Sequence, residues 1–132
     1  MNSETSNVLL LQVQIAQLIT LSSCVNLRAL HFRQVGPDVC TKLSLLFLLL
    51  AQVRSAVIRS LVFTLDIHIL ERLKEEEWLT LGRCLALPVY AGLDEVVFVI
   101  HYKTIALSEQ FLRRRLSGTD ARGILRFEFV PM

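Results

Sequence analysis

Apolar and polar residues alternate most regularly from Ile58 to Ile67, where the sequence reads Ile-Arg-Ser-Leu-Val-Phe-Thr-Leu-Asp-Ile. A period of two is typical of a β-strand whose two faces lie in different surroundings. This segment contains a three-residue step in which an apolar residue is followed by any residue and then by phenylalanine. The step occurs four times in the chain, and its copies begin at Leu30, Leu61, Val96 and Leu125. Recurrence at intervals of about 30 residues is typical of repeated supersecondary units. The pattern predicts four strands, one in each unit.

Each predicted strand follows a segment with helical character, which divides a single domain, residues 1–132, into helix-strand units. The units span residues 6–36, 37–67, 68–102 and 103–130. Helix-strand units in series imply parallel strands joined by right-handed crossovers. Because no such unit buries its apolar face alone, the units must stack. We therefore predict an α/β solenoid with helices on one side of a parallel sheet.

The first two helices are predicted from apolar periodicity. Leu11 and Leu18 lie on one stripe of a helix over 6–21, and the glutamines of this segment fall mainly on its other side. In the second unit, Asp38 is the predicted N-cap of a helix that continues to Val53. Because its apolar residues go nearly all the way round, we expect this second helix to be the most buried.

The other two helices carry signals at their ends. Glu75–Glu77 place acidic residues in a first helical turn, where they complement the helix dipole, and Pro88 ends that helix. In the last unit, Ser108 is the predicted N-cap. Arg113–Arg115 then occupy the last turn, and Ser117-Gly118 ends the helix.

High hydrophobicity raises the alternative of a membrane protein. Hydrophobic residues make up 53% of the 132 residues, and the mean hydropathy is +0.52. A spanning helix needs about 20 mostly apolar residues. The segment Leu43–Val53 is shorter, and Val8–Leu21 contains Gln12, Gln14 and Gln17. We therefore expect buried helices and no membrane association, with a membrane hairpin as the weaker alternative.

Charge and cysteine usage narrow the class of partner and the compartment. The net charge of +2 is too small to indicate nucleic-acid binding, and Arg113–Arg115 are explained by the helix dipole and by pairing with Glu109. Cys24, Cys40 and Cys84 form no C-x-x-C pair and have no histidine at metal-ligand spacing. They fit small buried residues in a reducing compartment, so we expect a cytoplasmic or nuclear protein.

No catalytic motif is found, because G-x-S-x-G, H-E-x-x-H and the glycine-rich phosphate-binding loops are all missing from the sequence. His31 and His101 belong to predicted strands that are not adjacent, about 9 to 10 Å apart. We predict no enzymatic activity, no cofactor and no metal. The alternative is a small α/β ligand-binding domain or enzyme with a polar pocket at the carboxyl ends of the strands, near His68, Tyr102 and Lys103.

The remaining candidate for function is the face of the predicted sheet opposite the helices, which we call the second face. It comprises His31, Arg33, Val62, Thr64, Asp66, Val97, Val99, His101, Arg126 and Glu128. Its valines form an apolar centre within a polar rim, as in protein–protein interfaces. The face measures roughly 300 Å², less than the about 800 Å² per partner of a standard interface. Loops, further repeats or a second chain must therefore contribute, unless another segment of the chain covers the valines.

The repeated steps resemble the strand half of a leucine-rich repeat. They read Leu27-x-x-Leu30-x-Phe32, Ile58-x-x-Leu61-x-Phe63, Leu93-x-x-Val96-x-Phe98 and, in shortened form, Leu125-x-Phe127. None contains the asparagine or cysteine that usually follows such a strand. The resemblance thus implies an irregular leucine-rich-repeat-like solenoid.

One combination of motifs resembles a known protein family more specifically. It consists of Glu77-Trp78 with Leu81 and Leu85, then the third repeated step, and then Gly123-Ile124-Leu125. That family is the F-box-like proteins of mushroom-forming fungi, and the similar part is their C-terminal repeat region. The resemblance covers residues 26–130 and implies a substrate-recognition region of a ubiquitin ligase subunit, with a protein substrate as partner. The F-box, which has a Leu-Pro-x-Glu-like start, is absent from residues 1–23. We expect a fragment or truncated relative, which binds a ligase adaptor only if an F-box lies upstream.

Overall fold

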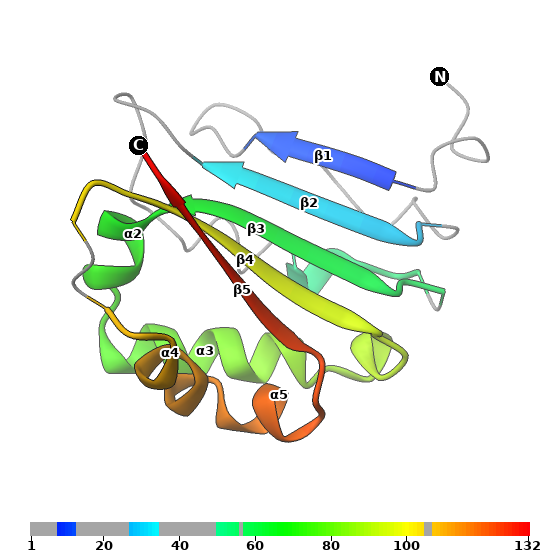
Figure 1. The fold of residues 1–132 in the computed structure, drawn as a ribbon. Coiled ribbons are helices and arrows are strands. Elements are labelled where there is room, and N and C mark those ends of the chain that lie inside the picture. Colours follow the sequence, from blue (N-terminus) through cyan, green and yellow to red (C-terminus); the bar gives the residue numbers. More distant parts are fainter. Residues whose placement is uncertain (1–7, 13–26, 35–49, 56, 105–106) are drawn as a thin grey trace.

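The computed structural model describes residues 8–12, 27–34, 50–55, 57–104 and 107–132. A sheet of five parallel strands, paired in the order β1-β2-β3-β4-β5, lies at the centre (Figure 1). The strands are β1 (Val8–Gln12), β2 (Ala29–Gln34), β3 (Ser60–Asp66), β4 (Glu95–Tyr102) and β5 (Leu125–Pro131). The predicted α/β class and parallel sheet are confirmed.

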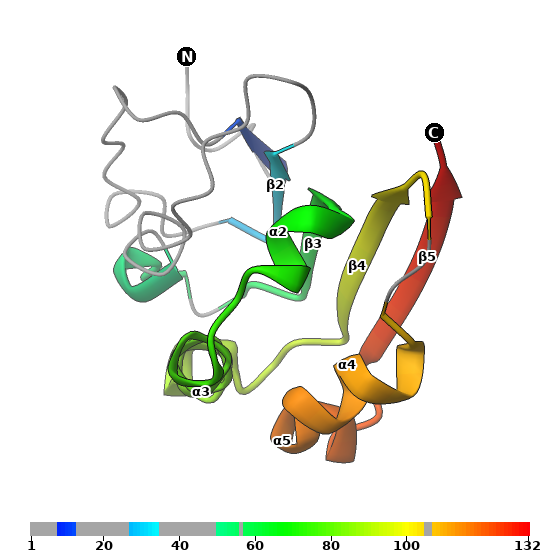
Figure 2. The same cartoon turned by 90° about the vertical axis from the view of Figure 1, so that its left-hand side faces the viewer.

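Helices occupy the connections that follow β3 and β4. The first connection contains α2 (Ile67–Glu71), α3 (Glu75–Leu85) and the 3₁₀ turn η2 (Pro88–Tyr90). The second contains α4 (Glu109–Arg115) and α5 (Ser117–Ala121). Figure 2 shows these α-helices on one side of β3, β4 and β5. The helices therefore cover one face of this part of the sheet.

The repeat in the sequence forms a row across the sheet. Leu30, Leu61, Val96 and Leu125, which begin the repeated step, are register partners on neighbouring strands from β2 to β5. All four are buried in the core. Because successive side chains on a strand point to opposite faces, a slip of one residue would turn every apolar member of the row away from the helices. Burial therefore fixes the register.

The phenylalanines of the repeated step form a second row, in which the rings stack. The ring centroids are 5.4 Å apart for Phe32 and Phe63, 5.0 Å for Phe63 and Phe98, and 5.6 Å for Phe98 and Phe127. The first three rings are buried, whereas Phe127, on the edge strand β5, is half-buried. Aromatic pairs at such separations add about 0.5 to 1.5 kcal/mol each beyond the burial of their area.

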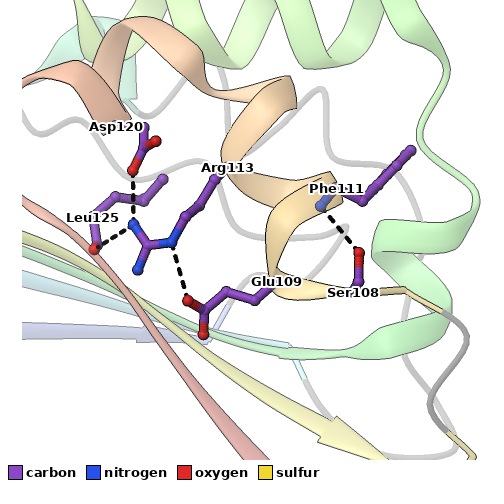
Figure 3. Close-up of polar contacts among 6 residues, drawn as sticks. All are labelled: Ser108, Glu109, Phe111, Arg113, Asp120 and Leu125. Atoms are coloured by element: carbon purple, nitrogen blue, oxygen red, sulfur yellow. Dashed lines mark hydrogen bonds and ion pairs between the residues drawn. The ribbon is translucent and has the colours of Figure 1, made fainter.

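Arg113 of α4 covers the half-buried end of this row and connects three elements (Figure 3). Its guanidinium carbon lies 5.2 Å from the centroid of the Phe127 ring. Its Nε donates to Oε2 of Glu109 at 3.0 Å, and one terminal nitrogen donates to Oδ1 of Asp120 at 2.7 Å and to the Leu125 carbonyl at 3.2 Å. The hydrogen bonds to Asp120 and Glu109 raise the pKa of Arg113. These contacts hold α4 and α5 against β5, and they confirm the predicted pairing with Glu109.

Two helices begin where their sequence signals predict. Glu75–Glu77 form the first turn of α3, and the backbone nitrogen of Lys74 donates to Oε1 of Glu77 at 3.1 Å. The Oγ of Ser108 accepts a hydrogen bond from the backbone nitrogen of Phe111 at 3.1 Å, which caps α4 (Figure 3). Both interactions satisfy backbone donors that a helix leaves unpaired in its first turn.

The predicted last turn of this helix, Arg113–Arg115, is confirmed, whereas the prediction that Ser117-Gly118 ends the helix is wrong. The chain breaks at Leu116, where ψ is 42°, and continues as α5 through the predicted terminators Ser117-Gly118. The glycine in the left-handed conformation is Gly123, with a φ of +72°. It follows α5 and turns the chain into β5, a position at which a side chain would be strained.

The predicted first helix is also contradicted where it is described, because Val8–Gln12 is strand β1. A short apolar run fits a helix or a strand equally well, and parallel pairing with β2 decides the outcome. The remainder of that predicted helix, residues 13–21, lies outside the described residues. The predicted strand over 58–67 also differs at its end, because β3 ends at Asp66 and Ile67 begins α2.

The second predicted helix is described over residues 50–53, of which 50–52 are helical and Val53 is not. Leu50 and Val53 are buried in the core. The hydroxyl of Tyr90, from η2, donates a buried hydrogen bond to the carbonyl of Leu50, and burial raises the pKa of this tyrosine. Among the described residues, no helix is long and apolar enough to cross a membrane.

Replacing Phe63 with alanine tests the ring row. Phe63 is completely buried between two other rings, so the substitution should lower the free energy of unfolding by about 3 to 5 kcal/mol. Urea denaturation measures this loss. Phe127→Ala is the matched control, because Phe127 has one ring partner and is half-buried, and its cost should be smaller. Equal stability of wild type and Phe63→Ala would contradict the register.

Replacing Arg113 with methionine tests its role in holding α4 and α5. Methionine keeps an apolar stem but loses the hydrogen bonds to Asp120 and the Leu125 carbonyl. Because the site is partly exposed, we expect a cost of about 1 kcal/mol, measured as a fall of the melting temperature by roughly 3 to 6 °C. The neighbouring Arg114 is exposed, so Arg114→Met should have little effect. Equal effects of the two substitutions would contradict the assigned role.

Candidate protein-binding face

The strand register brings the residues predicted for the second face into three rows opposite the helices. The first row contains His31, Val62, Val97 and Arg126, and the second contains Arg33, Thr64, Val99 and Glu128. Asp66 and His101 are partners one step further towards the carboxyl ends of β3 and β4. The structure thus places all ten on the face that was predicted, from four different strands.

Exposure differs from the prediction at two positions. Thr64 and Val97 keep only 3% and 9% of their surface exposed, so the expectation that they face solvent is wrong. Both lie on inner strands, as the more exposed Val62 and Val99 do, and Thr64 is also in contact with His31. Val62 and Val99 are half-buried and supply the accessible apolar surface of the face. Among the polar members, Arg33, Arg126 and Glu128 are exposed, whereas His31, Asp66 and His101 are half-buried.

A short polar contact joins β2 and β3 on this face. His31 Nε2 and Thr64 Oγ1 are 2.6 Å apart. Burial lowers the pKa of His31 below its ordinary value, and the nearby charge of Arg33 lowers it further. The imidazole is therefore neutral at pH 7, and in that form one ring nitrogen donates a hydrogen bond while the other accepts one. The threonine hydroxyl can serve as partner for either tautomer.

At the amino-terminal end of the strands, the face continues through two residues that the sequence analysis did not include. Ser60 and Glu95 are register partners, and Ser60 Oγ donates to Oε1 of Glu95 at 3.2 Å. The other oxygen of Glu95 lies 3.9 Å from Nε of Arg126. Extending the alternation by one step from Val62 and Val97 would have identified both residues. Glu95 thus places a carboxylate beside Arg126 at this end of the face.

At the carboxyl end, the polar residues have structural roles. Oδ1 of Asp66 accepts a hydrogen bond from the backbone nitrogen of His68 at 3.0 Å and so caps α2. The side chain of His68 lies 3.8 Å from Glu71. Tyr102 packs edge-on against Phe129, with ring centroids 6.3 Å apart. Of the residues named for an alternative pocket at this end, His68 and Tyr102 take part in separate contacts, and Lys103 is exposed.

Side chains that could ligate a metal lie apart from one another in the part of the chain that the structure describes. Among the described residues, no group of three or more His, Cys, Asp or Glu side chains is close enough to hold a metal ion. His31 and His101 lie on β2 and β4 with β3 between them, as predicted. Burial raises the pKa of Cys84 on α3, which favours its neutral thiol. Cys24 and Cys40 lie outside the described residues.

Comparison of this chain with protein-family models, with curated proteins and with solved structures finds no match. The case for a function rests on the residues of the sheet face and on their geometry.

The pKa of His31 predicts a specific pH dependence of stability. The unfolded chain binds a proton to this imidazole near its ordinary pKa of 6.5, whereas the folded chain resists protonation. The free energy of unfolding should therefore fall as the pH drops below about 6.5. In His31→Gln, which stays neutral, that fall should be smaller, as measured by urea denaturation between pH 7.5 and pH 5. His68→Gln is the control, and the same pH dependence in wild type and His31→Gln would contradict this assignment.

Proposed function

We propose that this chain is a non-enzymatic protein-interaction module whose second sheet face binds a protein partner. The observation that carries the proposal is the make-up of that face. Val62 and Val99 are accessible apolar side chains on its inner strands, with Arg33, Arg126 and Glu128 exposed around them. An apolar centre within a charged rim is the common anatomy of a protein interface.

Strand order supports binding to a surface in preference to chemistry in a cleft. In open α/β sheets, ligand sites form at a switch point, where the strand order reverses and helices leave on opposite sides. Here the five strands follow the sequence without reversal, and the helices after β3 and β4 lie on one side. Among the described residues, the strand order therefore shows no reversal of the kind that forms such a crevice, which supports the second face as the binding surface.

The size of the face suggests what else must take part. Five strands of about 17 Å at about 4.8 Å spacing give roughly 400 Å², which is half of the about 800 Å² that a standard interface buries on each partner. Ser60 and Glu95 enlarge the polar rim at one end. We propose that the partner also contacts segments beyond the strands, such as the loops at either end of the sheet.

The wider role that we propose is substrate recognition in an F-box-type ubiquitin ligase, within a leucine-rich-repeat-like solenoid. Support comes from the repeated step, whose apolar residues and phenylalanines pair in register from β2 to β5. Stacked units with parallel strands in sequence order are what such a solenoid requires. In this role the bound partner is a substrate for ubiquitination in the cytoplasm or nucleus, and recruitment of the ligase adaptor needs an F-box.

Site-specific crosslinking tests the binding face. A photoactivatable amino acid at Val99 should capture a defined protein in the native cell, whereas the same group at the exposed Glu76 on α3 should not. The double substitution Val62→Asp and Val99→Asp should weaken binding of the purified captured protein by about tenfold or more, because it places charges where apolar surface is desolvated. Unchanged binding of the double variant, with an unchanged melting curve, would contradict the proposal.

The ligase role is tested separately. If the captured protein is a ligase substrate, it should accumulate when the proteasome is inhibited and when this chain is depleted. If its level stays constant under both conditions, while crosslinking still depends on Val99, the chain is an interaction module outside ubiquitin transfer.

A further inference from the structure

A groove lies in the helical layer, on the opposite side of the molecule from the proposed binding face. It runs between α3 and the α4–α5 pair and has a volume of about 340 Å³. Its walls are largely apolar and include Trp78, Leu79, Leu85 and Leu116. Leu79 is 55% exposed, an unusual position for a large apolar side chain in a helix that packs on a core.

Two glycines border open space in this groove. Gly82 of α3 and Gly118 of α5 both line it, and a β-carbon added at either would meet no atom within 4 Å. Neither has a positive φ, so no backbone constraint requires glycine there. Glycine is the least favourable residue after proline inside a helix. The fold therefore gains nothing from Gly82, whereas an incoming backbone could approach α3 closely at this point.

The rim of the groove carries positive charge that carboxylates of the chain only partly offset. Arg83 and Arg122 have no carboxylate within ion-pair distance among the described residues, whereas Arg115 lies 3.7 Å from Glu75. The guanidinium of Arg122 donates to the carbonyls of Leu85 (3.3 Å), Tyr90 (2.8 Å) and Ala91 (3.2 Å). These bonds hold the group in place at the carboxyl ends of α3 and η2 and offset part of its charge, while no carboxylate of the described residues pairs with it, which suits recognition of an anion.

We propose that this groove binds an acidic amphipathic helix of a partner protein. Apolar side chains at helical spacing would contact Leu79 and Ala86, which are exposed, above the buried Trp78, and carboxylates on the flanks would meet Arg83 and Arg122. The glycines admit the close approach of a helix backbone. The helix α3 is 11 residues long, about 16 Å at 1.5 Å per residue, which matches roughly three turns of a helix in a groove. This inference is independent of the proposed role of the second face.

The chain contains its own probe for this site, because its single tryptophan, Trp78, lines the groove. The test ligand is a synthetic helical peptide of about four turns without tryptophan, with leucines at i, i+3, i+4 and i+7 and glutamates on the flanks. A second peptide carries lysine in place of every glutamate. Titration into the full chain is followed by the fluorescence of Trp78 and by the anisotropy of the labelled peptide.

We expect saturable binding of the glutamate peptide and binding of the lysine peptide weaker by about tenfold or more. Gly82→Phe, which fills the groove, should weaken binding of the glutamate peptide by a similar factor. Glu76→Phe is the matched control, since it adds the same ring to an exposed position of α3 outside the groove. It should leave the affinity unchanged.

Charge exchange provides a test that does not depend on filling the groove, in case Gly82→Phe fails to fold. Arg83→Glu should weaken binding of the glutamate peptide and strengthen binding of the lysine peptide. Val62→Asp with Val99→Asp should leave binding to the groove intact, so a failure of this inference is distinct from a failure of the proposed function.

The proposal is overturned if the glutamate peptide does not bind, or if it binds Gly82→Phe and wild type equally. Equal affinity for both peptides, together with no effect of Arg83→Glu, would overturn the assigned role of the arginines. A small molecule with an apolar chain and one carboxylate could also occupy the groove, and dodecanoate is the probe for this alternative. If dodecanoate alone binds, and Gly82→Phe abolishes this binding, the groove is a small-molecule site and the helix proposal is wrong.

Discussion

The in-register stacking of Phe32, Phe63, Phe98 and Phe127 is the interaction on which the rest of this fold depends. Each ring belongs to a different strand, so the stack exists only when all four strands are parallel and aligned. Ring contact and backbone pairing therefore favour the same register, and a slip in one strand disrupts both. Such agreement between levels of structure gives a sequence one preferred fold.

The helices α4 and α5 are held at the end of the phenylalanine row on the edge strand β5. Phe127 has a ring on one side only, and Arg113 covers it from α4 while bonding to Asp120 of α5 and to the Leu125 carbonyl. A cation over the ring also lets the exposed end of an apolar row meet water. The helix α5 also contacts α3, and residues of both helices line the groove.

The two sides of the sheet offer different chemistry for recognition. The strand face presents half-buried valines among exposed charges, a surface for a partner of matching shape. The helical side presents an apolar groove with arginines at its rim.

The sequence by itself determined the parallel α/β class, the rows of β2 to β5, the starts of α3 and α4 and the membership of the second face. Those features follow from local periodicity and from caps, which involve residues close together in the chain. Only the tertiary structure decided that Val8–Gln12 is a strand, that α5 follows α4, and that Thr64 and Val97 are shielded. Each of these depends on a neighbour distant in sequence, such as β2 beside β1 or His31 beside Thr64. The groove between α3 and α5 has the same origin, since Gly82 and Gly118 come together only when both helices pack on the sheet.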